Sequence, residues 1–205
     1  MGRRLNIAPT RSSLLAIRRR VEFLEQGHKL LERKKELLTR LVYERLAQYR
    51  ELRGETQVLL AEAYRWLSIA TLRMSGQAIH QASIGLAPAL EVEILPRRSL
   101  GVEYPSVSAQ LQPLQPVGLL GTDASLDQTR IDLARAAVVL ARLGEAEMAL
   151  WRLLEEQRKT QKRVNALRYN IIPRYRETLR YIEAVLEEEE RNTLFQLKRL
   201  QQAEG

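Results

Sequence analysis

Residues 14–42 decide the fold of this chain. They read LLAIRRRVEFLEQGHKLLERKKELLTRLV, and their apolar residues recur in alternating steps of three and four. The pattern continues to residue 73 and defines two sets of positions that repeat every seven residues. The first set contains Leu14, Val21, His28, Lys35, Val42, Tyr49, Thr56, Ala63 and Ala70. The second contains Ile17, Leu24, Leu31, Leu38, Arg45, Leu52, Leu59, Trp66 and Arg73. Thirteen of these 18 residues are apolar. A heptad pattern of about nine repeats predicts a coiled coil with a partner helix.

The first predicted helix is unusually long. No proline interrupts residues 10–76, and Thr10, directly after Pro9, is a suitable N-cap. We therefore predict an N-terminal extension over residues 1–9 and one helix over residues 10–76. Such a helix measures roughly 100 Å at about 1.5 Å per residue. A compact globule of this size has a radius of gyration of only about 17 Å, so the pattern predicts an elongated molecule. Trp66 lies on the second set and is expected to pack against the partner helix.

The middle section, residues 77–124, has a different texture. It contains five of the seven prolines, which break any helix. Residues 90–95, LEVEIL, alternate apolar and acidic side chains, a pattern typical of a strand. Residues 96–99, PRRS, are typical of a turn, and a second short strand is expected over residues 100–104. The section therefore predicts a small β-hairpin at the far end of the helices.

A second long helix is predicted over residues 125–202. Ser125-Leu126-Asp127-Gln128 has the pattern of a capping box, with Ser125 as the N-cap and Gln128 reaching back. The expected apolar face contains Leu133, Leu140, Leu143, Leu150, Leu154, Val164, Ile171, Tyr175, Leu179, Ile182 and Leu186. Pro173 lacks an amide hydrogen and predicts a kink near Ile172. The fold class is therefore all-α: a long antiparallel two-helix coiled-coil hairpin, with a small β-hairpin and loop region at its distal end.

The composition excludes several functions. The sequence has no cysteine, so it offers no disulfide, thiolate metal site or cysteine nucleophile. It has only two histidines and no phosphate-binding glycine loop, and we expect no metal, no cofactor and no active site. No run of about 18 apolar residues and no secretory signal are present, which favours a cytoplasmic protein. The net charge of +8 favours an acidic partner.

Two stretches, one on each long helix, resemble a known family. The first is Pro9-Thr10-Arg11-x-x-Leu14 followed by Gly27-His28-x-Leu30-Leu31-x-x-Lys34-Lys35-x-x-Leu38. The second is Lys159-Thr160-Gln161-Lys162-Arg163-Val164-Asn165-Ala166-Leu167 followed by Ile172-Pro173-Arg174, Tyr181-Ile182 and Leu186-x-Glu188. Together they resemble the D subunit of V-type and archaeal-type (A-type) ATPases. Arg168 departs from the family pattern, in which an acidic residue commonly follows RVNAL, and this affects one local salt bridge.

The resemblance implies a function without catalysis. The chain would be the central-stalk rotor subunit, whose termini enter a hexamer of catalytic A and regulatory B subunits. Its loop end would bind the small F subunit and a funnel-shaped subunit on the membrane ring. ATP hydrolysis or synthesis on the hexamer would be coupled to ion transport by rotation. The protein would be peripheral to the membrane, with no direct insertion and no nucleic acid.

We expect two contact surfaces on this basis. The hexamer-bearing surface comprises Thr10, Arg11, Leu14, Arg18, Lys162, Arg163, Leu194, Leu197 and Lys198. The F-subunit surface comprises Tyr64, Trp66, Leu67, Val138, Leu143 and Trp151. The N-terminal arginines, including Arg11 and Arg18, are expected to lie in an acidic bearing of the hexamer.

Two other interpretations of the residues remain open. The isoelectric point near 10.0 permits a basic coiled-coil protein that binds nucleic acid, although few aromatic residues are present for base stacking. A tethering coiled coil would form a stable homodimer. The residues of this chain decide neither the transported ion nor the direction of the reaction, because both belong to other subunits.

Overall fold

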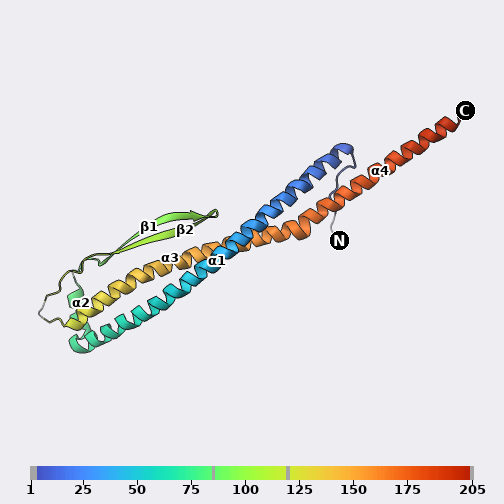
Figure 1. The fold of residues 1–205 in the computed structure, drawn as a ribbon. Coiled ribbons are helices and arrows are strands. Elements are labelled where there is room, and N and C mark those ends of the chain that lie inside the picture. Colours follow the sequence, from blue (N-terminus) through green and yellow to red (C-terminus); the bar gives the residue numbers. More distant parts are fainter. Residues whose placement is uncertain (1–3, 85, 119–120, 204–205) are drawn as a thin grey trace. The chain divides into compact units, whose positions relative to one another are not determined.

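The structure is a computed structural model that describes residues 4–84, 86–118 and 121–203. Residues 1–3 of the predicted N-terminal extension lie outside the described residues. The elements are α1 (Arg11–Met74), α2 (Gly76–Ser83), β1 (Leu90–Ser99), β2 (Val102–Leu111), α3 (Ala124–Ala166), the π-helical turn η1 (Leu167–Ile171) and α4 (Ile172–Ala203) (Figure 1). The predicted fold class, two long helical segments joined by a section with a small β-hairpin, is confirmed.

Residue contacts divide the chain into two compact units. The first unit comprises Met1–Leu37 and Gln157–Gly205, and the second comprises Leu38–Glu156. Each unit contains one segment of α1 and one segment from the C-terminal half of the chain. In the first unit Arg11 pairs with Glu190 and Arg18 with Glu183. In the second, Arg73 pairs with Asp123 and Val42 packs with Leu150. Within each unit the two helical segments therefore run antiparallel.

The buried residues of α1 follow the heptad. They are Ile17, Val21, Leu38, Val42, Thr56, Ala63 and Ala70, and all seven belong to the two predicted sets. The prediction for Trp66 is wrong, because this side chain is 36% exposed and Leu67 is half-buried instead. In this part of α1 the buried side follows Ala63, Leu67 and Ala70.

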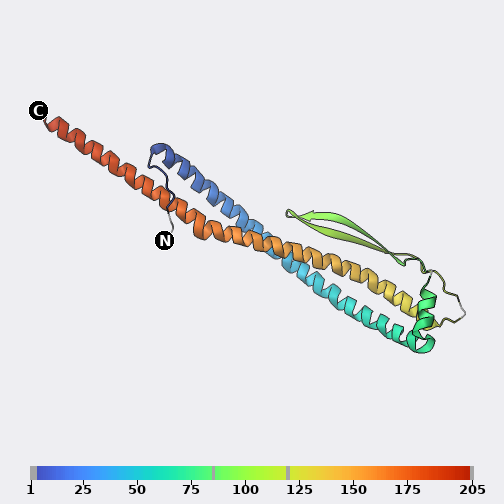
Figure 2. The same cartoon turned by 180° about the vertical axis from the view of Figure 1, so that it is seen from behind.

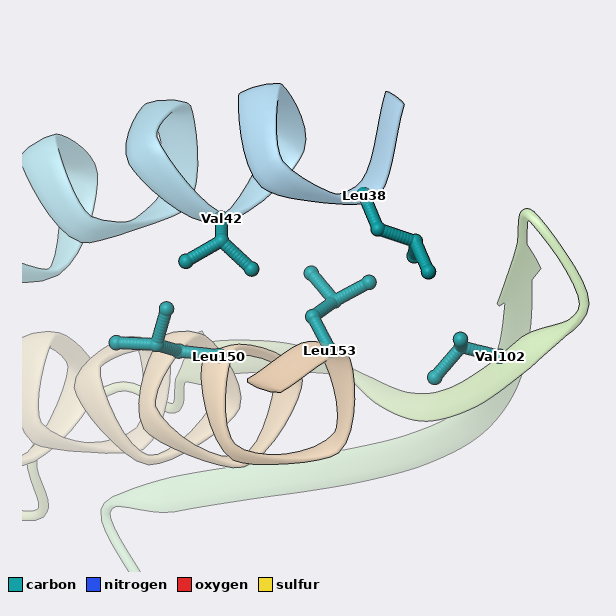
Figure 3. Packing of buried hydrophobic residues seen from close by; sticks show 5 residues of the cluster. All are labelled: Leu38, Val42, Val102, Leu150 and Leu153. Carbon is teal, nitrogen blue, oxygen red and sulfur yellow. The ribbon is translucent and has the colours of Figure 1, made fainter. Parts of the chain in front are cut away.

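The core of the second unit joins three elements. Leu38 and Val42 of α1 point toward Leu150 and Leu153 of α3, and Val102 of β2 lies beside them (Figure 3). Leu38 and Leu153 are completely buried. The β-hairpin is therefore part of the core of this unit.

The predicted apolar face of α3 is wrong at one position. Leu140 is 49% exposed, whereas Ala136 and Ala149 are buried. The distance between two helix axes depends on the side chains at their contact, and small residues permit a close approach. The buried side of α3 passes through Ala136, Val139 and Ala149 and leaves Leu140 in solvent.

The two long helical segments begin at different kinds of cap. The oxygen Oγ1 of Thr10 accepts a hydrogen bond from the Ser13 amide (3.1 Å), which confirms Thr10 as the N-cap of α1. The predicted capping box at Ser125 is wrong. Asp123 is the N-cap of α3, because its carboxylate accepts hydrogen bonds from the amide and the hydroxyl of Ser125. Gln128 donates to Asp132 (2.9 Å) and does not reach back.

The predicted turn at residues 96–99 is also wrong. β1 and β2 pair antiparallel from Leu90 opposite Leu111 to Ser99 opposite Val102, so the turn consists of Leu100 and Gly101. Both residues have positive φ angles, 50° and 78°, as in the type I′ turns that suit a twisted hairpin.

Prolines are tolerated inside both strands because of their position in the ladder. Pro96 lies opposite Pro105. The Val107 amide, two residues after Pro105, points away from β1 and donates to Oε2 of Glu145 on α3 (2.8 Å). Backbone N–H groups point alternately toward and away from the neighbouring strand, so those of residues 105 and 107 point the same way. The nitrogen of Pro105 therefore points away from β1, and its missing hydrogen costs no bond between the strands.

The hairpin folds back along α3 (Figures 1 and 2). The Val107–Glu145 hydrogen bond attaches β2 to α3. Tyr104 is only 4% exposed, and the Arg45 guanidinium of α1 lies 5.9 Å from the centre of its ring. The hairpin thus begins at the loop end of α3, and its tip reaches the Leu38–Leu153 core.

The N-terminal segment of the first unit forms a strap, residues 4–10, along α4 (Figure 1). The Leu5 amide donates to Oγ1 of Thr178 (3.0 Å), and the Arg4 guanidinium lies 4.3 Å from the centre of the Tyr181 ring. Ile7 packs on the buried cluster of Ile17, Val21 and Ile182. The heptad pattern contains no signal for this packing.

Candidate interaction surfaces

Ion pairs at heptad spacing join the helices of the first unit. Arg11 pairs with Glu190 (2.8 Å) and Arg18 pairs with Glu183 (2.9 Å). Arg176 pairs with Glu25 (2.5 Å), so the third pair has the opposite polarity. The positions on α1 are 11, 18 and 25, and those on α4 are 190, 183 and 176. Arg11 and Arg18 are therefore already paired within the chain and are not a simple positive pole.

The structure brings three of the predicted bearing residues together. Arg11, Leu14 and Arg18 line one open groove of about 410 Å³ with residues of α4. Leu14 is half-buried against the Ile17 cluster, and Thr10 caps the helix beside it. This groove forms one side of the tip of the first unit.

The end of α4 carries apolar side chains in solvent. Arg11, the first residue of α1, pairs with Glu190, so the last turns of α4 extend past the start of α1 (Figure 1). In these turns the exposed apolar residues are Leu194 (60%), Phe195 (63%), Leu197 (53%) and Leu200 (62%). Lys198 is exposed among them. Such a surface is typical of a contact site, because clustered large apolar side chains are rare on the surface of a soluble monomer.

A basic segment begins the C-terminal part of the first unit. Residues 157–176 contain no Asp or Glu. Their cations are Arg158, Lys159, Lys162, Arg163, Arg168, Arg174 and Arg176. Seven positive charges in this segment nearly equal the net charge of +8 of the whole chain. Only Lys162 and Arg163, both exposed, were predicted as contacts, although the absence of acids was visible in the sequence.

The basic segment includes a helical irregularity. The turn η1 directly precedes Ile172 and Pro173, and the Ile172 amide donates to the Leu167 carbonyl five residues earlier. In a regular helix the proline ring clashes with the carbonyl four residues before it, here that of Tyr169. A π-helical turn changes the position of that carbonyl and accommodates the ring.

The residues expected to bind the F subunit form two separate groups. On α1, Tyr64 is 59% exposed and Trp66 is 36% exposed, whereas Leu67 is half-buried. On α3, Trp151 is 67% exposed, and Val138 and Leu143 are half-buried. Trp151 follows Leu150, which packs with Val42 of α1. Because Val42 and Tyr64 lie 22 residues apart, the structure separates Trp151 from Tyr64 by about 33 Å along α1.

A groove between the hairpin and α3 was not predicted from the sequence. It has a volume of about 590 Å³ and is lined by the hairpin residues Ile94, Leu95, Pro96, Glu103, Tyr104 and Pro105 and by Met148 and Arg152 of α3. Ile94 is 65% exposed and Met148 is 47% exposed. The sequence contained no signal for this groove, because the fold-back of the hairpin onto α3 depends on tertiary packing.

The described residues were also compared with the requirements of a metal site and of a membrane span. It contains no group of three or more His, Cys, Asp or Glu side chains that could hold a metal ion. Among the described residues no helix combines the length and the apolar character that a membrane span requires. The surfaces above are suited to contacts with other proteins.

Comparison with known proteins identifies the family. The family model that describes the D subunit of ATP synthase matches residues 13–202. The D subunit of the V-type ATP synthase of Thermotoga neapolitana is 34% identical over 199 residues, which cover 97% of this chain and 98% of that protein. The D subunit of the A-type ATP synthase of Pyrococcus furiosus is 33% identical over 200 residues, which cover 96% and 94%. That of Methanosphaera stadtmanae is 34% identical over 196 residues, which cover 94% and 92%. The matches extend over both helical segments and the hairpin, and the chain belongs to the family of ATP synthase D subunits.

Proposed function

We propose that this chain is the central-stalk rotor of a V-type or A-type rotary ATPase and has no catalytic activity of its own. ATP hydrolysis or synthesis would take place on partner subunits, and rotation of this chain would couple it to ion transport. The observation that carries the proposal is the exposed apolar end of α4, next to the ion-paired tip, in a chain of the D-subunit family.

The tip is proposed to enter a hexamer of catalytic A and regulatory B subunits. Leu194 and Leu197 supply apolar contact area there, and Thr10, Arg11, Leu14, Arg18 and Lys198 surround it. Lys162 and Arg163 of the basic segment would meet acidic side chains that line the cavity. Ion pairing of this kind fixes orientation more than it raises affinity.

The second unit is proposed to hold the small F subunit. The support is the exposure of Tyr64, Trp66 and Trp151, since aromatic side chains are enriched in protein interfaces. Trp151 of α3 lies far from Tyr64 of α1 when their separation is measured along the helix axis. The bound F subunit would therefore cover a long strip of the two helices. The loop end would dock into the funnel-shaped subunit on the membrane ring, so that the protein is peripheral to the membrane.

Torque requires that the rotor present different faces to equivalent neighbours. In the first unit one edge of the helix pair carries the three ion pairs, and the basic segment contains positive charge without acids. A catalytic interface that closes around a nucleotide contacts these faces with different free energies. Closure therefore favours one angular position of the rotor over another.

The tip contact can be tested by binding to the purified hexamer. The double variant Leu194→Glu with Leu197→Glu should bind at least tenfold more weakly, because it places charge in an apolar contact. The matched control is Leu111→Glu, an exposed leucine of the hairpin, which should bind normally. Unchanged affinity of the double variant would show that the end of α4 does not contact the hexamer.

The proposed contact between the basic segment and the hexamer is tested with substitutions away from the ion-paired tip. Glutamate at position 11 or 18 would also face Glu190 or Glu183, so an effect on binding would mix internal repulsion with a lost contact. Lys162→Glu with Arg163→Glu avoids those pairs and should weaken hexamer binding more at low salt than at high salt. An effect that is equal at all salt concentrations would contradict an electrostatic contact.

A further inference from the structure

The junction between α1 and α2 contains a strained residue. Ser75, which separates Met74 from Gly76, has φ 68° and ψ 150°. This region of the backbone map is populated almost only by glycine, because a β-carbon there crowds the neighbouring carbonyl. A serine in this conformation stores free energy that a helical conformation would release.

The hydrogen bonds on both sides of Ser75 are already helical. The Ser75 amide donates to the Thr71 carbonyl (3.1 Å), and the Ile79 amide donates to the Ser75 carbonyl (3.2 Å). Both bonds span four residues, as in an α-helix. Each helix is therefore regular up to Ser75, and Ser75 is the single non-helical residue between α1 and α2.

Packing does little to hold this junction. Strained backbone normally persists where the surrounding structure compensates for it. No residue of α2 is buried, and Leu72, in the last turn of α1, is 87% exposed. In this conformation a β-carbon added to Gly76 would meet no more distant part of the chain within 4 Å, so an alanine there is accommodated.

We propose that Ser75 is a one-residue hinge, which switches α2 between a bent arm and a straight continuation of α1. When Ser75 turns into the right-handed helical region, residues 75–83 join α1 and lengthen it by about 13 Å. The hinge thus sets how far the loop end of the second unit reaches. It is a property of the chain alone and does not depend on the rotor proposal.

The hinge can be measured on the isolated full chain with pairs of spin labels. The chain has no cysteine, so the introduced cysteines are the only labelling sites. Arg65→Cys with His80→Cys spans the junction, and Arg53→Cys with Ser68→Cys spans the same 15 residues inside α1. The pair inside α1 gives the separation of a continuous helix, about 22 Å.

Two backbone variants separate the bent state from the straight state. In the otherwise unchanged chain the pair across the junction should show mainly a shorter distance than the pair inside α1. Ser75→Gly removes the strain and should leave only the shorter distance. Ser75→Ala with Gly76→Ala favours the helix and should raise the ratio of long to short distances at least tenfold. Ser68→Ala, a serine with helical backbone, is the matched control and should change nothing.

Two results would overturn the proposal. The first is a distance distribution that Ser75→Ala with Gly76→Ala leaves unchanged while circular dichroism shows a folded chain. The second is a chain without backbone variants whose junction pair gives only the continuous-helix distance, because the bent state would then not be populated. Neither result depends on the identity of the partner subunits.

Discussion

Asp123 combines a helix cap, which the sequence pattern predicts at Ser125 instead, with an ion pair. Its carboxylate caps α3 through Ser125, and it pairs with Arg73 at the end of α1 (3.0 Å). The hydrogen bond from the Ser125 hydroxyl, followed by that from Arg73, lowers the pKa of Asp123 from 3.8 to about 2. One carboxylate thereby joins the two helices of the second unit where they meet the loop.

The lowered pKa predicts a pH dependence. Because the folded carboxyl has the lower pKa, its ionised form stabilises the fold above about pH 3.8, and this contribution is lost as the pH falls through about 2. Asp123→Asn should therefore be less stable than the parent chain at pH 5–7, and the difference should shrink between pH 4 and pH 2. Urea unfolding at each pH measures it. A difference that stays constant down to pH 2 would show that the charge plays no part.

Thr178 is predicted to hold the N-terminal strap. Its hydroxyl is completely buried, accepts the Leu5 amide and donates to the Arg174 carbonyl (2.8 Å). Thr178→Val keeps the shape but leaves the Leu5 amide without its acceptor, at a cost of about 1 kcal/mol. Hydrogen exchange at the Leu5 amide should accelerate. In Thr193→Val, which removes an exposed hydroxyl bound only to Glu189, exchange at Leu5 should not change.

The ion pairs between α1 and α4 are arranged to specify the register. A slip by one heptad in one direction places Arg18 opposite Arg176, and a slip in the other direction places Glu25 opposite Glu183. The reversed third pair thus introduces like charges into either slipped register. Exposed ion pairs contribute little stability, about 0.5 kcal/mol each, but they can select among registers whose apolar contacts are similar.

This arrangement predicts the outcome of a charge swap. Glu25→Arg alone should destabilise the chain by about 0.5–1 kcal/mol, because the introduced guanidinium faces Arg176. Adding Arg176→Glu should restore stability, yet it makes the polarity of all three pairs the same and allows a heptad slip. Cysteine cross-linking between α1 and α4 should then detect two registers where the parent chain shows one. A double variant with a single register would mean that apolar packing alone sets it.

The kink at Pro173 stays a prediction, and the π-helical turn η1 gives it a physical basis. Pro173→Ala restores the amide hydrogen and removes the ring, so η1 should convert to a regular helix. Spin labels at positions 163 and 184 should then move toward the straight-helix separation of about 32 Å. If the separation in the parent chain is already that long, the helix is not kinked there.

Much of the fold could be predicted because one physical pattern governs it. Every buried residue of α1 lies on the heptad from Leu14 to Arg73, since burial on a long helix is periodic. The turn, the second helix cap and the exact seam residues were harder to predict from the sequence. In each case a neighbouring residue fits the sequence pattern equally well, and tertiary packing decides which one takes the role. The residues that take these roles are Gly101 in the hairpin turn, Asp123 as the cap and Ala136 in the seam.

The contact surfaces could be predicted only in part. The exposed leucines lie in the last turns of α4, beyond the buried cluster around Ile182, and resemblance to the family pointed to them. The groove of Ile94 and Met148 brings together residues about 50 positions apart, and the strap on Thr178 brings together residues 173 apart. Contacts between residues so far apart in the sequence cannot be predicted from local sequence patterns.

The central claim concerns what this chain assembles with, and the most direct test is the composition of its complex. The tagged chain would be purified from detergent-solubilised membranes and weighed by native mass spectrometry. A rotor predicts one copy of this chain together with three copies each of two large nucleotide-binding subunits. Recovery of the chain only as a homodimer, or only with nucleic acid, would contradict the account.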